Sequence, residues 1–231
     1  LPYTERLTGV PVLANMLQRF GSVYIKPSDG LFGNRIFTVS PAENGFALKD
    51  GRGKTVLKGE PDEVFQRFCE GRNPEDYLVQ QDVSRRVKNK LVDFRVILQK
   101  DGSGKWTCAG MIARTGMSAG VITNTVSDLN FADEALQGRF GLTEAEAARV
   151  KSNIESMCIE AAQHMEKAYG TYGDLGIDVA VDPQNRPWLL EINMFHQHNL
   201  ANDLEGGDEV YRRVVSNPLL FAKYLSGFGR T

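Results

Sequence analysis

The residues best suited to chemistry in this sequence stand on a predicted β-hairpin near its C-terminal end. Two alternating apolar runs flank a turn that we centre between Gln184 and Asn185. This register places Asp178 directly opposite Glu191, with Asn193 further along the same face. Adjacent carboxylates repel unless a cation lies between them, and Mg²⁺ prefers oxygen ligands. The pattern predicts a magnesium site, and the alternative is a polar face that is merely solvated.

The same register predicts which face of the hairpin is buried. It pairs three sets of apolar residues across the two strands: Ile177 with Ile192, Val179 with Leu190, and Val181 with Trp188. Because side chains alternate along a strand, all six then point to the core and leave the carboxylates on the other face. The agreement with hydrophobicity supports this register.

A second constellation stands near the start of the chain. Lys26 ends a predicted strand, and the loop after it contains Gly30 and Gly33. An ammonium group beside glycine backbone that can be approached closely suits a chain of phosphates. The simpler interpretation is an exposed lysine before a hairpin turn. A P-loop is not expected at 51–55, since Leu48 stands where its first glycine is required, and we predict a hairpin tip there.

A third predicted hairpin, over residues 92–115, brings two arginines together. A turn between Gly102 and Ser103 places five residues on one face: Asp93, Arg95, Gly110, Ile112 and Arg114. The two arginines then point into one space. The alternative is an ordinary surface ion pair between Asp93 and Arg95.

The elements that position these residues divide into a β-rich front part and a larger rear part. The longest helix is predicted from a capping box of Thr143 and Glu146 and runs to Gly170. A strand beginning at Tyr77 leads into a basic stretch that we interpret as the crossover between lobes. We therefore expect two domains, a smaller lobe over residues 1–84 and a larger lobe over residues 85–231.

Composition limits the classes of function. The chain has 231 residues, 42% of them hydrophobic, with 27 basic and 29 acidic residues and a net charge of −2. Such a chain buries a sizeable core but carries no global field for nucleic acid, and it contains no apolar run of membrane-spanning length. Three separated cysteines without a C-x-x-C pair are expected as free thiols. We expect a cytoplasmic protein with neither nucleic-acid nor membrane partners.

Five motifs in order resemble the ATP-grasp superfamily: Lys26 with its glycine loop, YLVQQDV, DFRVI, GMIART, and GIDVAVD followed by WLLEIN. The sequence is most similar to the bacterial spore-coat-associated YheC/YheD-type group, whose domains open with a segment like Leu1–Thr4. The resemblance implies an α+β fold with two α+β lobes gripping ATP between them. It also implies an N-terminal domain that would precede Leu1 and is missing from this chain.

The resemblance assigns the nucleotide to residues of the front part. Lys26 would contact the α and β phosphates, and the loop from Gly30 to Gly33 would close over the triphosphate. Arg35 stands where the family has its last loop glycine, which stiffens the loop or adds a cation to the phosphates. The adenine would be held through strand backbone at four residues: Gln80, Gln81, Asp82 and Val83.

The resemblance likewise assigns the metal and the reaction. Magnesium, as two ions for which Mn²⁺ can substitute, would be coordinated by Asp178, Glu191 and Asn193. Arg114 would lie beside the γ-phosphate and the acyl group. Arg95, which the predicted hairpin places beside Arg114, and Lys26 are the other candidate catalytic residues. The implied reaction joins a small-molecule or peptide carboxylate to an amine through an acylphosphate.

Two other functions remain open on the same resemblance: a non-catalytic or weakly nucleotide-binding spore-coat scaffold, and a kinase-like phosphotransferase. The segment after Asn193 departs from the family and contains His196 and His198. These histidines are interpreted as substrate contacts or as metal ligands, the latter lacking a third nitrogen or sulfur ligand nearby. Spore-coat association is the alternative to a purely cytoplasmic location.

Overall fold

The structure, a computed structural model, describes residues 1–29, 35–117, 120–121 and 126–228. The chain divides into two compact units: Leu1–Leu91 with Gly116–Ser127, and Val92–Thr115 with Asp128–Thr231. Relative to the predicted lobes, residues 85–91 and 116–127 lie with the first unit. The loop glycines Gly30 and Gly33 fall outside the described residues.

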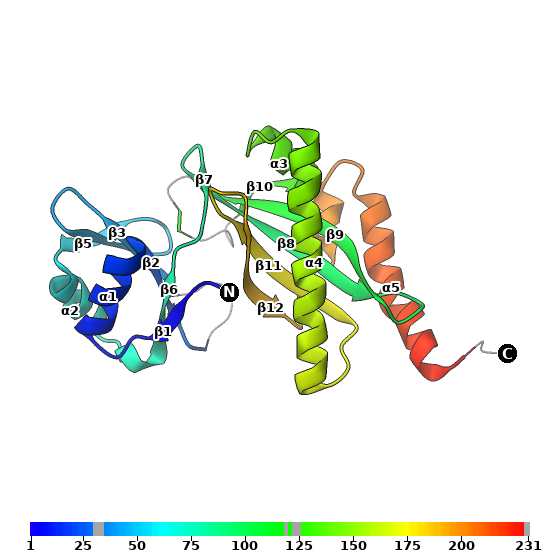
Figure 1. Cartoon of the computed structure of the whole chain (residues 1–231), viewed down its shortest axis with the longest axis horizontal. Coiled ribbons are helices and arrows are strands. Elements are labelled where there is room, and N and C mark those ends of the chain that lie inside the picture. Colours follow the sequence, from blue (N-terminus) through cyan, green and yellow to red (C-terminus); the bar gives the residue numbers. More distant parts are fainter. Residues whose placement is uncertain (30–34, 118–119, 122–125, 229–231) are drawn as a thin grey trace. The chain divides into compact units, whose positions relative to one another are not determined.

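The first unit is a six-stranded antiparallel sheet with two helices (Figure 1). In spatial order the strands are β1 (Thr4–Arg6), β6 (Tyr77–Gln81), β2 (Val23–Pro27), β3 (Phe37–Pro41), β4 (Phe46–Lys49) and β5 (Thr55–Gly59). The other elements are α1 (Val10–Phe20), α2 (Pro61–Cys69), the 3₁₀ turn η1 (Pro74–Asp76) and the short strand β7 (Arg86–Val87). Leu13 and Met16 of α1 and Phe68 of α2 are fully buried against the sheet, which fixes the position of β2 and β6.

The second unit is built on a sheet with the strand order β10-β9-β8-β11-β12. These strands are β10 (Val126–Phe131), β9 (Trp106–Gly116), β8 (Lys90–Lys100), β11 (Asp174–Val181) and β12 (Pro187–Asn193). The helices are α3 (Ala132–Gly138), α4 (Glu144–Tyr169) and α5 (Asp208–Ser226), with the 3₁₀ turn η2 (Asn199–Asp203). The capping box of Thr143 and Glu146 and the end at Gly170 are confirmed for α4.

Helices pack on both faces of this second sheet (Figure 1). Lys100 of β8 pairs with Glu166 of α4, whereas the neighbouring Gln99 donates from Nε2 to the carbonyl oxygen of Val214 in α5, at 2.9 Å. Successive side chains of a strand point to opposite faces, so the odd-numbered residues of β8 face the α5 side. No helix within the described ranges is long and apolar enough to cross a membrane, and the three cysteines are free, as predicted.

Three hairpins close with the same three-residue loop, whose segments read DGRGK, DGSGK and DPQNR in the sequence. They span Asp50–Lys54, Asp101–Lys105 and Asp182–Arg186. In each, the aspartate Oδ1 accepts backbone N–H groups two and four residues on, at 2.8–3.1 Å. The third loop residue has positive φ, which glycine and asparagine tolerate: Gly53 at 80°, Gly104 at 78° and Asn185 at 61°. The hairpin tip predicted at 51–55 is confirmed as the first of these loops.

These loops correct the register predicted for the β11–β12 hairpin. The turn has three loop residues instead of two, so Val181 pairs with Pro187 and Val179 with Leu189. The predicted pairings of Val179 with Leu190 and of Val181 with Trp188 are therefore wrong. A bulge between Asp178 and Val179 leaves Leu190 as the extra residue on β12. Toward the open end of the hairpin, the predicted pairs of Ile177 with Ile192 and of Asp178 with Glu191 are therefore confirmed.

The bulge predicts that two adjacent leucines differ in their importance for stability. Leu189 is buried at 8% exposure, whereas Leu190 is half-buried. Leu189→Gln places an unpartnered amide in the core and should lower the free energy of unfolding by about 1–3 kcal/mol. Leu190→Gln should lower it by clearly less, as measured by urea unfolding of both variants. An equal or larger loss at Leu190 would contradict the observed register.

The β8–β9 hairpin shows why a wrong turn can leave a predicted face intact. Its loop is displaced from the predicted turn, and a bulge follows between Ile97 and Leu98, so that Asp93 pairs with Arg114 and Arg95 with Ile112. The net displacement is two residues, which equals the period of side chains along a strand. The predicted common face of Asp93, Arg95 and Arg114 is confirmed, although the partner of each residue differs.

Candidate functional site

Four charged side chains form a buried cluster on the second unit's sheet. Asp93 and Arg95 of β8, Arg114 of β9 and Asp178 of β11 are each 6–9% exposed. Arg114 binds Asp93 through two hydrogen bonds of 2.8 Å, and Arg95 binds Asp178 through two of 2.5 and 3.0 Å. Arg114 Nη2 also lies 3.2 Å from Asp178 Oδ2 and joins the two pairs. The surface pair of Asp93 with Arg95, considered from the sequence, is replaced by these two buried pairs.

The cluster holds its charges in fixed positions. Burial by itself lowers the pKa of the Arg114 guanidinium, but the charges and hydrogen bonds of Asp93 and Asp178 outweigh burial and raise that pKa. Two cations and two anions balance, so the desolvated groups stabilise one another. Paired guanidinium forks offer oriented N–H donors, the groups that recognise phosphate and carboxylate oxygens. The sequence places Asp93 on this face but assigns it no catalytic or binding role, because its position opposite Arg114 depends on the loop and the bulge.

The predicted metal ligands share one face of the β11–β12 hairpin. Asp178 is buried and stands opposite Glu191, which is exposed, while Asn193 is half-buried opposite Gly176. All three offer oxygen atoms, and one carboxylate is open to solvent, so the residues fit Mg²⁺. Both oxygens of Asp178 already accept arginine hydrogen bonds, and a carboxylate has about four lone-pair sites in all. Glu191 and Asn193 therefore offer the more accessible oxygens.

In the first unit, two of the predicted nucleotide residues meet. Lys26 of β2 lies one strand away from Gln80 of β6, and its Nζ donates to Gln80 Oε1 at 2.5 Å. Gln80 in turn donates from Nε2 to Thr4 Oγ1 at 3.0 Å. The lysine ammonium is thus held at a defined place on the sheet by Gln80, whose own amide is fixed by Thr4.

The backbone of β6 is less open than the adenine prediction assumes. β6 lies between β1 and β2, so its backbone is paired on both sides. The N–H of Gln81 donates to Tyr3 and that of Asp82 to Ser22, at 2.9 and 3.1 Å. An adenine held by this strand must therefore use backbone groups beyond the Asp82 N–H, next to the buried Val83.

Arg35 has a backbone conformation that glycine favours. Its φ is 60°, in the left-handed region that glycine favours, and its side chain is exposed. A non-glycine residue there costs about 1–2 kcal/mol. The geometry supports the sequence interpretation that Arg35 occupies a glycine position, and it presents a guanidinium at the end of the segment that contains the loop glycines.

The sequence matches the family described as YheC/D like ATP-grasp over residues 1–225. The endospore coat-associated protein YheD of Bacillus subtilis (strain 168) is 25% identical over 210 residues, which cover 84% of this chain and 43% of YheD. The endospore coat-associated protein YheC of the same organism is 20% identical over 233 residues, which cover 97% of this chain and 62% of YheC. The chain thus spans about half the length of these curated relatives.

A solved structure also resembles this one. It is the C-terminal domain of K. lactis Pby1, described as an ATP-grasp enzyme interacting with the mRNA decapping enzyme Dcp2. The alignment has a TM-score of 0.49 and 11% sequence identity, and it covers 92% of this chain and 61% of that one.

Proposed function

The chain belongs to the YheC/D-like ATP-grasp family, and from that premise we propose that it is an ATP- and magnesium-dependent ligase joining a carboxylate to an amine through an acylphosphate. The family supports ATP-dependent activity of the ligase or kinase kind in general. The observation that carries the finer proposal is the strand face on which Arg95, Arg114 and Asp178 stand beside Glu191. It combines oriented cations with oxygen ligands, as phosphoryl transfer to a carboxylate requires.

The chain's own residues would mainly position the reactants and neutralise charge. Lys26 is assigned to the α and β phosphates of ATP, and Arg95 and Arg114 to the transferred phosphoryl group and the acyl carboxylate. Magnesium, when bound by Glu191, Asn193 and Asp178, would neutralise phosphate charge. The buried ion pairs keep both guanidiniums oriented before substrate arrives, which reduces the reorganisation needed during the reaction.

The proposed reaction has two balanced steps. A carboxylate oxygen of the donor attacks the γ-phosphorus of ATP, and the bond to the β-phosphate oxygen breaks to release ADP. The amine then attacks the acyl carbon, and inorganic phosphate leaves as the amine loses a proton. Since the arginines contact the phosphoryl and acyl oxygens in both steps, no nucleophilic serine or cysteine is needed.

A second candidate, a coat-associated scaffold with weak or no nucleotide turnover, is favoured by a specific contact. Both oxygens of Asp178 accept hydrogen bonds from Arg95, so this carboxylate is already neutralised without a metal. Both relatives carry endospore coat-associated names. We propose the same association for this chain alongside a cytoplasmic location.

Trapping of the acylphosphate tests the ligase proposal without knowledge of the natural amine. The full chain is incubated with ATP, Mg²⁺, hydroxylamine and a panel of amino acids, dipeptides and hydroxy acids. An acyl hydroxamate should form in step with ADP for at least one carboxylate, and omission of hydroxylamine or of the carboxylate should reduce ADP to a slow background. A phosphorylated alcohol without hydroxamate would indicate a kinase, and no ADP with any panel member would favour the scaffold.

A further inference from the structure

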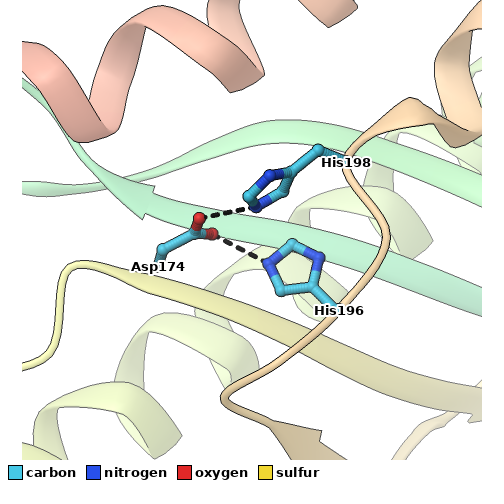
Figure 2. A group of neighbouring side chains, drawn as sticks. All are labelled: Asp174, His196 and His198. Carbon is cyan, nitrogen blue, oxygen red and sulfur yellow. Dashed lines mark hydrogen bonds and ion pairs between the residues drawn. The ribbon is translucent and has the colours of Figure 1, made fainter.

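The segment after β12 carries two histidines that meet a carboxylate at the start of β11 (Figure 2). His196 Nε2 lies 2.8 Å from Asp174 Oδ1, and His198 Nε2 lies 2.7 Å from Asp174 Oδ2. The two imidazole rings are edge to face, with centroids 4.7 Å apart. Residues separated by more than twenty positions in the sequence thus converge on one point of the second unit.

Of the three side chains, His196 is buried and tightly packed, whereas Asp174 and His198 are partly exposed to solvent. The His196 side chain is 1% exposed and lies directly over Gly176, where even a Cβ atom would come within 2.6 Å of the imidazole. Its Nδ1 is buried without a hydrogen-bond partner in the described part of the chain. His198 and Asp174 are 42% and 24% exposed, so a small ion can reach the three side chains from solvent.

The carboxylate is kept in the form that binds cations. Burial by itself raises the pKa of Asp174, but side-chain hydrogen bonds from His196 and Gln99 lower it below its usual value. Potential ligand atoms of the three residues all lie within 4.8 Å of one another. A tetrahedral zinc with bonds near 2.0–2.1 Å separates its ligand atoms by about 3.3 Å. The two histidines, which contact different oxygens of Asp174 at 2.7 and 2.8 Å, would each move slightly away from the carboxylate to admit the ion between them.

We propose that Asp174, His196 and His198 form a binding site for a divalent transition metal of the zinc class, on the same strand face as the proposed magnesium ligands but nearer the start of β11. Imidazole nitrogens favour zinc and its neighbours, whereas magnesium favours oxygen alone. Two histidines and one carboxylate leave room for a water at the fourth position. Asp174 and Asp178 are four residues apart on the same face of β11, or about 13 Å at the rise of a strand, so an ion held by Asp174 is out of reach of Asp178.

The metal's role at this place is to hold a segment in position. It fastens residues 194–198, which follow the proposed ligand Asn193, to the beginning of β11 on the same sheet. The sequence offers no third nitrogen or sulfur ligand near His196 and His198. The third ligand is a carboxylate on the neighbouring strand, brought there by the antiparallel pairing of β11 and β12.

Cobalt and zinc binding to the untagged, metal-stripped full chain tests this proposal without any assay of ligase activity. Co²⁺ should bind with one equivalent and give the visible absorption of tetrahedral cobalt, and Zn²⁺ should displace it and raise the melting temperature. His198→Gln, at the most exposed ligand, should reduce affinity by more than the roughly 100-fold that loss of an outer-shell partner costs. Asp174→Asn should do the same while keeping the side-chain shape.

The chain supplies its own control, since it has three histidines in all. The third, His164, is exposed on α4 with its Nδ1 2.8 Å from the Glu160 carbonyl oxygen. His164→Gln should bind Co²⁺ as the unchanged protein does, and so should Glu191→Gln. The proposal is overturned if neither metal binds saturably, which would leave a hydrogen-bonded contact only, or if His198→Gln binds normally. Loss of binding in Glu191→Gln would also overturn it by placing the metal beside Asp178 and Glu191.

Discussion

Glu191→Gln should reduce ATP-dependent turnover by at least about 100-fold and leave the free energy of unfolding nearly unchanged. The substitution keeps the shape of the side chain and removes one charge directly opposite Asp178. Glu191 is exposed, so its side chain supplies little packing energy to the fold. Asp178 is already neutralised by its hydrogen bonds from Arg95, so removing the neighbouring charge should alter the stability of the metal-free protein little. Turnover is measured by hydroxamate formation, and stability by urea unfolding.

A binding measurement separates loss of the metal from loss of the reaction. ATP should raise the melting temperature of the unchanged protein in Mg²⁺ and much less in excess chelator, because ligand binding stabilises the folded state by mass action. In Glu191→Gln, the shift in Mg²⁺ should fall toward that in chelator. Glu160→Gln, at an exposed position on α4, is the matched control and should behave as the unchanged protein. Full turnover in Glu191→Gln would exclude this face as the magnesium site.

Asp93→Ala should have the largest effect on stability, a loss of about 3–5 kcal/mol. It removes the partner that makes two hydrogen bonds to Arg114 and leaves the buried guanidinium, among the residues that the structure describes, with the 3.2 Å contact to Asp178. An uncompensated buried charge is costly because neither water nor another anion replaces the lost carboxylate. Chemical denaturation, followed by a signal from the second unit, measures the loss.

The control for this prediction is an ion pair of the same chemistry near solvent. Asp128 and Arg139 pair with side chains 44% and 30% exposed, so Asp128→Ala should cost less than about 1 kcal/mol. The double substitution of Asp93→Leu with Arg114→Met should recover much of the stability, since it removes both buried charges together. A loss below 1 kcal/mol for Asp93→Ala alone would show that the cluster is not the source of stability.

The sequence by itself determined the family and the faces of the strands. Ordered motifs, each weak alone, pointed to an ATP-grasp fold, and the family match over residues 1–225 confirms that identification. Alternation along β8, β9 and β11 placed the charged residues on one face, and this survived a wrong turn because a shift of two residues leaves side chains on the same face. Alternation depends only on neighbouring residues within a strand, so it predicts the face of each side chain even when the loop length is wrong.

Loop length and bulges were not recovered from alternation, although a local signal for the loops was present. The segments DGRGK, DGSGK and DPQNR share an aspartate and a residue that tolerates positive φ, and each closes a three-residue loop. Asp178 still stands opposite Glu191 because the longer loop and the bulge at Leu190 cancel. A bulge leaves little trace in composition, since its position is set by how the strands pack on the helices around them.

Only the tertiary structure decided which side chains meet across strands. The pairing of Arg114 with Asp93, the contact of both arginines with Asp178, and the approach of His196 and His198 to Asp174 all join residues far apart in the sequence. Residue types and spacing state what each group can bind, but whether two groups meet depends on strand order and register. These in turn depend on burial of the whole sheet, a property that no single segment of the sequence carries.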